Sequence, residues 1–255
     1  MESVKNKLGN LLDKFYGIIP GSYWAFIGGI FGLLVFLLAV ILHSLTVPVN
    51  IFTQPVSSLG WGPNGSEPVF KIGLIVLGVL LAPYILYLTR LLWAKSGEDH
   101  SRLRNLLNGL GLITALIAVI GLFNVSLWGN VYTQPEFLWH LIGAFVYFFF
   151  AMIFTFLFTL SMILSKNWNK AQVIFTIIMI IEFIPFLIFS IELLSDTEII
   201  NAILNPNLEA RVAVFIPAMA NKIWWNFFEW LNVLSTLVWM ILTGIHTVKL
   251  ERELK

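Results

Sequence analysis

The sequence predicts an all-α integral membrane protein, a bundle of six transmembrane helices preceded by an amphipathic helix at the membrane surface. Of its 255 residues, 58% are hydrophobic and only 11% are charged. A soluble domain is about half apolar and about a quarter charged, so this chain has too few polar side chains to cover a globule in water. Six segments along it are apolar enough to cross a hydrocarbon core of about 30 Å.

The composition also excludes several function classes. A net charge of +1 offers no broad basic surface to polyanions, so we expect no nucleic-acid partner. The chain has no Cys, four dispersed His and no HExxH motif, so we expect neither a metal site nor a thiol nucleophile. It has no Gly-rich phosphate loop and no GxSxG elbow, and we expect no cofactor.

Residues 1–22 are predicted to form an amphipathic segment in the membrane interface. Three lysines, Lys5, Lys7 and Lys14, are interspersed with apolar residues, which are Leu8, Leu11, Leu12, Phe15 and Tyr16. A basic face opposite an aliphatic and aromatic face is typical of helices that lie on a membrane.

The predicted membrane domain covers residues 23–248 and contains six apolar segments. These are Tyr23–Leu45, Ile72–Trp93, Leu106–Phe123, Leu138–Leu164, Ala171–Leu193 and Ile223–Val248. Each has about the 20 residues that a helix needs to cross a bilayer. The first is too long for a signal peptide, and no small-residue cleavage site follows it. Residues 249–255 form a charged tail.

The distribution of Lys and Arg predicts that both termini are cytoplasmic. With the N-terminus inside, the cytoplasmic side receives twelve of these residues: Lys5, Lys7, Lys14, Arg90, Lys95, Arg102, Arg104, Lys166, Lys170, Lys249, Arg252 and Lys255. The outer side receives three: Lys71, Arg211 and Lys222. Cytoplasmic loops carry an excess of positive charge, so this asymmetry indicates the orientation, and we expect a multi-pass protein of the cell membrane.

Five ionisable residues lie at membrane depth, where they are costly and usually face the bundle interior. They are His43, His140, Glu182, Glu229 and His246. One face of the sixth span carries a polar stripe of Asn226, Glu229, Asn232, Thr236 and Thr243. The fourth span carries a matching stripe of His140, Ala144, Tyr147, Ala151, Thr155 and Thr159. Residues at such spacing share a helix face, so we expect these two spans to face each other or share a cavity.

The outer loops are longer and more irregular than the inner ones, which favours the outer side for function. The apolar segment Val212–Ala218 is expected to dip into the interface and cap the bundle. Six tryptophans gather on this side and are expected to form an aromatic belt: Trp61, Trp128, Trp139, Trp224, Trp225 and Trp230. Asn64 and Asn124 each begin an Asn-x-Ser tripeptide, which is too common by chance to predict glycosylation.

Four short motifs occur along the chain in an order that resembles a known family. They are Ser57-Ser58-Leu59-Gly60 with Pro63-Asn64 and Glu67, Gly121-Leu122-Phe123-Asn124, His140-Leu141-Ile142-Gly143-Ala144, and Glu229-Trp230-Leu231. Their order and placement among six spans resemble the superfamily of the FGF-receptor-activating protein and the damage-regulated autophagy modulators. A related prokaryotic family of unknown function is also similar.

The resemblance implies links to lipid-anchored protein remodelling, phosphoinositide signalling and autophagy, without a common biochemical activity. The matching positions are Ser58, Gly60, Asn124, His140, Gly143, Ala144, Glu229 and Trp230. Relatives often have an acidic residue between that Ser and Gly, where this chain has Leu59.

Three functional hypotheses follow, beside the alternative that the polar stripes only hold the bundle together. In the first, the protein binds or senses a membrane lipid in a cleft of its outer half. The binding residues would be Ser58, Gly60, Asn124, His140, Tyr147, Glu229, Trp230 and Asn232. In the second, a membrane enzyme remodels a lipid or a lipid-anchored head group, with His140 and Glu229 as acid–base partners. In the third, a small proton-coupled transporter uses Glu182 as its protonatable site.

Overall fold

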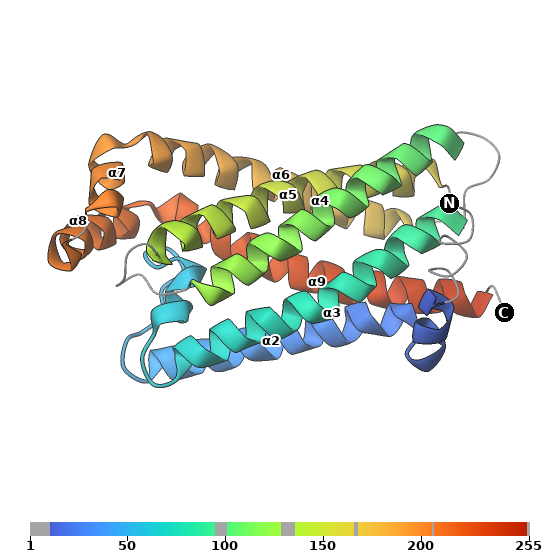
Figure 1. Ribbon diagram of the computed structural model, residues 1–255, viewed down its shortest axis with the longest axis horizontal. Coiled ribbons are helices and arrows are strands. Elements are labelled where there is room, and N and C mark those ends of the chain that lie inside the picture. The colour runs from blue at the N-terminus through green and yellow to red at the C-terminus, as the bar shows by residue number, and fades with distance from the viewer. Residues whose placement is uncertain (1–10, 95–100, 129–135, 166–167, 206, 254–255) are drawn as a thin grey trace.

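The computed structural model describes residues 11–94, 101–128, 136–165, 168–205 and 207–253. Within these ranges the chain is helical and contains no strand. The six long helices are α2 (Gly21–Ser44), α3 (Ser66–Ala94), α4 (Ser101–Leu127), α5 (Glu136–Leu164), α6 (Lys170–Ser195) and α9 (Ile223–Glu253) (Figure 1). All six are long and apolar enough to cross a membrane, which confirms the six predicted spans.

Several helices extend beyond the apolar segments that predicted them. α3 begins at Ser66 instead of Ile72, and α4 runs from Ser101 to Leu127 instead of from Leu106 to Phe123. Apolar composition marks only the part of a helix inside the hydrocarbon. At a rise of about 1.5 Å per residue, the additional turns lengthen these helices toward the roughly 40–45 Å that includes the head-group regions.

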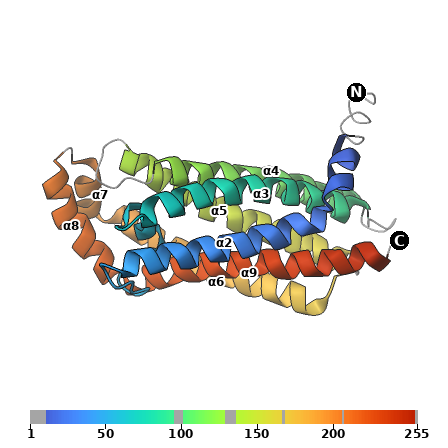
Figure 2. The same ribbon diagram turned by 90° about the horizontal axis from the view of Figure 1, so that it is seen from below.

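The six long helices pack in a ring, in the order α2, α3, α4, α5, α6 and α9, and α9 closes the ring against α2 (Figures 1 and 2). The two helices that close the ring approach closely at Gly29. A Cβ atom added there would lie only 2.9 Å from the carbonyl oxygen of Leu237. Small residues allow such close approach between membrane helices.

The two ends of the bundle differ. The helix over residues 11–18 and the end of α9 lie at one end, here called the terminal end (Figure 1). The opposite end, here called the loop end, carries three short helices: η1 (Val56–Trp61, a 3₁₀ helix), α7 (Thr197–Leu204) and α8 (Leu208–Asn221). With six spans crossing a membrane, the first and last described helices would lie on the same side of it. Which side is cytoplasmic stays a prediction.

The outward faces of the spans carry large apolar side chains such as Leu34, Ile120 and Ile188, all of them well exposed. Such a surface would be costly in water and is suited to lipid. The bundle is therefore a multi-pass membrane protein.

The expected belt of six tryptophans divides into two groups. Trp128, Trp139 and Trp224 are exposed. The other three are buried or half-buried, and the side-chain N–H groups of two of them are hydrogen-bonded inside the bundle. Trp61, Trp225 and Trp230 are therefore not part of an exposed belt, because Trp225 packs on α6, Trp230 binds the Gln54 carbonyl and Trp61 lies against His140.

The helix over residues 11–18 crosses the terminal end of the bundle (Figure 2). The Tyr16 hydroxyl donates a hydrogen bond to the carbonyl oxygen of Pro83 over 2.7 Å, and Asp13 pairs with Arg90. Burial raises the pKa of Tyr16 to about 12, against the opposing effect of the Arg90 charge. The predicted amphipathic helix is present over 11–18, and the part of the prediction on residues 1–10 lies outside the described residues.

Candidate functional site

The 3₁₀ helix η1 is inserted into the loop end of the bundle. Its residues from Val56 to Gly60, including the family positions Ser58 and Gly60, are buried. The Ser66 hydroxyl, at the start of α3, donates a hydrogen bond to the Leu59 carbonyl over 2.8 Å. η1 therefore closes the space between the spans and serves as the cap of the bundle.

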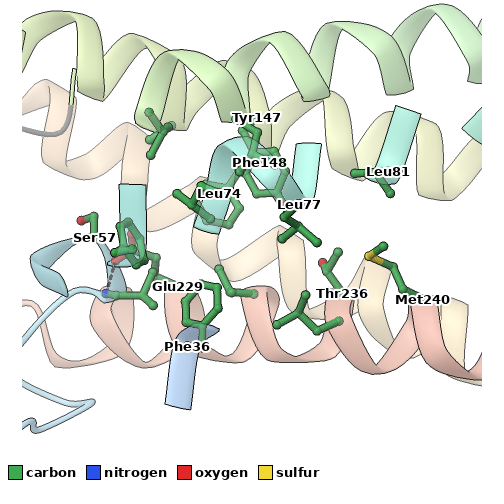
Figure 3. A pocket seen from close by; sticks show the side chains of 17 residues that line it. Phe36, Ser57, Leu74, Leu77, Leu81, Tyr147, Phe148, Glu229, Thr236 and Met240 are labelled. Atoms are coloured by element: carbon green, nitrogen blue, oxygen red, sulfur yellow. Dashed lines mark hydrogen bonds between the residues drawn. The ribbon is translucent and has the colours of Figure 1, made fainter. Parts of the chain in front are cut away.

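A cluster of polar side chains on α9 holds the backbone of this cap. Oε2 of Glu229 accepts a hydrogen bond from the Val56 N–H over 3.0 Å (Figure 3), and Ser57 also hydrogen-bonds to this carboxylate. The Trp230 indole N–H donates to the Gln54 carbonyl over 2.9 Å. Since the Glu229 carboxylate lies at the start of η1, where helical N–H groups lack internal partners, it satisfies donors that would otherwise be buried alone.

Asn226 completes this clasp and was absent from the predicted site residues. Its side-chain amide donates to the Phe52 carbonyl over 3.2 Å. Its spacing three and four residues before Glu229 and Trp230 places all three on one side of α9, and that spacing could have included it. We refer to Asn226, Glu229 and Trp230 together as the clasp.

The family positions on α4 and α5 fasten these two helices to each other. The Asn124 side-chain amide donates to the Trp139 carbonyl over 2.8 Å. Nδ1 of buried His140 lies 3.2 Å from the Val125 carbonyl. Because a carbonyl can only accept, Nδ1 carries the proton of this hydrogen bond. At Gly143 an added Cβ would lie 2.8 Å from the Val125 nitrogen, so the two backbones cross in close contact there.

His140 and Glu229 do not contact each other through a hydrogen bond or ion pair in the described part of the chain. The two ends of η1 lie against them instead. Glu229 binds the start of η1 through Val56, and the Trp61 ring at its end packs edge-on against the His140 ring, 6.0 Å between centroids. The expected direct pairing is therefore not formed among the described residues, where Glu229 binds the start of η1 and His140 binds the Val125 carbonyl.

A cavity with a volume of about 40 Å³ lies beneath the cap, inside the ring. Figure 3 shows Ser57 and Glu229 at its loop end and Leu81 and Met240 at its other end. Its walls are mostly apolar, with Phe36 from α2, Leu74 from α3, Leu122 from α4, Phe148 from α5 and Val233 from α9 among the lining residues.

The fourth and sixth predicted spans, α5 and α9, both line this cavity, as expected from their polar stripes. The two helices face each other across this cavity, although neither has the other as its main packing partner. Among the described residues, α5 packs on α4 and α6, whereas α9 packs on α2 and α6. The two helices approach across the cavity, where the Tyr147 hydroxyl hydrogen-bonds to Thr236.

Glu182 lies at a separate place, between α6 and α9. Its side chain hydrogen-bonds to Ser235, and its backbone carbonyl accepts a bond of 3.4 Å from the Asn232 amide. Oε2 of Glu182 and Oδ1 of Asn232 are both buried with no hydrogen-bond partner among the described atoms. Glu182 and Asn232 are thus side by side, as polar contacts between neighbouring spans.

The segment Val212–Ala218 lies within α8, which packs chiefly on α7 at the loop end. The clasp and the cavity described above are covered by η1. The predicted position of Val212–Ala218 in the membrane interface, capping the bundle, stays a prediction.

Comparison with known proteins supports the resemblance drawn from the motifs. A family model described as Frag1/DRAM/Sfk1/Cwh43P N-terminal domain matches residues 20–245, which include most of each of the six spans, the cap and the clasp. No curated protein and no solved structure matches the chain.

Proposed function

This chain belongs to the Frag1/DRAM/Sfk1/Cwh43P family, and from that premise we propose that this multi-pass membrane protein binds a membrane lipid at its loop end. One acyl chain would enter the central cavity, and the head group would replace the cap above it. The observation that supports this proposal is the mostly apolar cavity, which runs along the bundle from a carboxylate and a serine at the cap to Met240.

The closed cavity is too small for a whole acyl chain. Its volume of about 40 Å³ is well below the roughly 150 Å³ of an apolar cavity that admits benzene. Lipid entry therefore requires η1 to move outward, with rotation of flexible lining side chains such as Met240. In this proposal the structure is the unliganded, closed form, and the clasp sets the free energy of opening.

The head group supplies the specificity. An acyl chain gains little by moving from the bilayer into an apolar cavity, because lipid tails are as apolar as the side chains that line it. The polar end of the cavity is lined by Glu229 and Ser57, and Ser58 follows Ser57 in η1. Ser58 Oγ is buried without a hydrogen-bond partner among the described atoms. These groups suit a head group with hydroxyl or amine donors.

The enzyme and transporter hypotheses rank behind lipid binding. An acid–base pair must be assembled around the reacting atoms, and here His140 and Glu229 bind opposite ends of η1. Glu182 lies beside Asn232 at the contact of α6 with α9, and it is not among the residues that line the cavity. We also propose the cell membrane as the location and the loop end as the outer side, on the strength of the Lys and Arg asymmetry.

The test is photo-crosslinking with phosphatidylethanolamine, whose head group carries amine donors, bearing a diazirine in one acyl chain, with the full chain in nanodiscs. We expect crosslinks at Leu77, Val233 and Met240 inside the cavity, besides those at lipid-facing positions such as Ile245. The variant Ala144→Trp fills the cavity and should remove only the interior crosslinks.

Ile142→Trp is the matched control, because it places the same ring on the exposed face of α5. It should leave the interior crosslinks unchanged. If crosslinks form only at lipid-facing positions in the unmodified chain, the proposal is wrong, and the clasp and cavity serve the stability of the bundle alone.

A further inference from the structure

A second pocket lies at the terminal end, between α6 and α9, on the opposite side of the molecule from the cap. Its volume is about 250 Å³. Its lining includes the polar residues Asn169, Gln172, His246 and Lys249 and the apolar residues Leu242 and Ile245. Neither the family match nor the proposed function accounts for this pocket.

The pocket has a positive electrostatic character. Lys249 is exposed at its rim, and it forms no ion pair with any carboxylate whose side chain the structure describes. Lys170, also exposed, begins α6 beside the pocket. No Asp or Glu occurs among the residues that line the pocket. An anion would therefore meet attraction from these cations without repulsion from the walls.

The start of α6 adds to this field. The Ala171 N–H donates to the Asn169 side chain over 2.9 Å, so Asn169 caps a helix of 26 residues whose first turn faces the pocket. Helix N-termini carry a partial positive charge and favour anions. On the α9 side, the His246 ring packs against buried Trp168 with 4.9 Å between centroids, which fixes one wall of the pocket.

The apolar side chains of the pocket favour an amphiphilic ligand over a free anion. Leu242 and Ile245 are exposed on the lipid side of α9, within the span that ends at Lys249. A molecule seated here has its charged part at Lys249 and an apolar part that continues along these side chains into the bilayer. A volume of about 250 Å³ is just below the roughly 300–1,000 Å³ of small-molecule pockets, which suits a head group whose acyl chains remain outside.

We propose that this pocket binds the phosphate head group of an anionic glycerophospholipid from the leaflet at the terminal end. Lys249 and the N-terminus of α6 hold the phosphate, Asn169 and Gln172 face the glycerol, and Leu242 and Ile245 contact the first methylenes of the chains. Basic pockets between membrane helices bind anionic head groups in this way.

The test is native mass spectrometry of the full chain released from nanodiscs of phosphatidylcholine mixed with phosphatidylglycerol. We expect the unmodified protein to retain phosphatidylglycerol in preference to phosphatidylcholine. Lys249→Gln should lower that retention roughly fivefold, the effect of about one lysine near an anionic head group. Lys249→Arg keeps the positive charge and should retain phosphatidylglycerol as the unmodified protein does.

Lys222→Gln is the matched control, because it removes one positive charge next to the same helix at the loop end, where Lys222 pairs with Glu192. It should leave the retention unchanged. Ile245→Trp fills the pocket without a change of charge and should abolish the retention, which keeps the test decisive if Lys249→Gln does not fold.

Three results would overturn the proposal: equal retention of the two lipids, an equal loss in Lys222→Gln, or displacement of phosphatidylglycerol by inorganic phosphate alone. The last would indicate a site for a free anion. Ala144→Trp, which fills the central cavity, should not affect phosphatidylglycerol at the terminal end. Failure of this proposal is therefore distinguishable from failure of the proposed function.

Discussion

Removal of the Glu229 carboxylate should free the cap from the bundle. In Glu229→Ala, the N–H of Val56 and the donors of Ser57 lose their acceptor. Val56 is only 3% exposed, so water cannot replace that acceptor while the cap stays closed. An unsatisfied buried donor costs about 1–3 kcal/mol. The two backbone N–H groups, those of Val56 and Ser57, should by themselves lower the free energy of opening by roughly 2–6 kcal/mol, because both are solvated once η1 leaves the bundle.

A single cysteine can report this opening, because the natural chain has none. Ser58 is buried within η1, so in Ser58→Cys the thiol reacts with a water-soluble maleimide only when the cap opens. A tenfold change in an equilibrium corresponds to about 1.4 kcal/mol, so Glu229→Ala should raise the labelling rate by at least about 30-fold. Glu229→Gln keeps one acceptor oxygen and should raise it by about tenfold.

The matched control is Glu67→Ala, which also removes a glutamate at the loop end. Glu67 pairs with Lys71 on the exposed start of α3, and such surface pairs contribute about 1 kcal/mol or less. Its labelling rate should change less than that of either Glu229 variant. A second reporter, Thr243→Cys, is buried deep in α9 and should stay unreactive. Unchanged labelling of Ser58→Cys in Glu229→Ala, or equal gains at both reporters, would refute the clasp.

Three further predictions concern other parts of the chain. Gly143→Val should push α5 away from α4 and lower the thermal unfolding temperature measurably, because even a Cβ atom added at Gly143 would lie 2.8 Å from the Val125 nitrogen. An unchanged unfolding temperature would contradict the close crossing. Single cysteines at Thr53 and Ser101 should react with an impermeant reagent from opposite sides of the membrane in intact cells, and labelling of both from outside would contradict the six-span topology. Tyr16→Phe should cost about 1 kcal/mol near neutral pH through the lost bond to Pro83. Because the folded pKa of about 12 exceeds the usual value near 10, Tyr16 stabilises the fold below about pH 10 and loses that effect as the pH rises toward 12. The difference in unfolding temperature between the two proteins should therefore narrow over that interval, and a constant difference would contradict the buried hydroxyl.

The spans were predictable because lipid imposes one strong constraint on a long stretch of sequence. A helix in hydrocarbon must be apolar over about 20 residues, and that signal is visible without knowledge of its neighbours. The order of the helices in the ring was not predictable in this way. The α4–α5 crossing depends on Gly143, and a glycine carries no information about which helix approaches it.

The site was predictable in its residues and not in its contacts. Glu229 and His140 were recognisable as costly polar groups in apolar surroundings, and both are buried. Their partners were hidden because these are backbone groups, the Val56 N–H and the Val125 carbonyl, and every residue except proline carries both kinds of group. The sequence therefore indicated the two polar side chains and suggested that they contact each other, whereas in the structure each of them binds a peptide group of the backbone.

The bond between Val56 and Glu229 spans 173 positions along the chain, and this separation imposes an order on biogenesis. Synthesis proceeds from the N-terminus, so the segment around η1 is made long before α9 exists. Until the last span has entered the membrane, Val56 and Ser57 have no carboxylate to bind, and the central cavity stays uncovered. Closure of the cap is thus a late event that reports complete insertion. A chain truncated before residue 229 would keep this segment exposed to proteases and chaperones at the loop end.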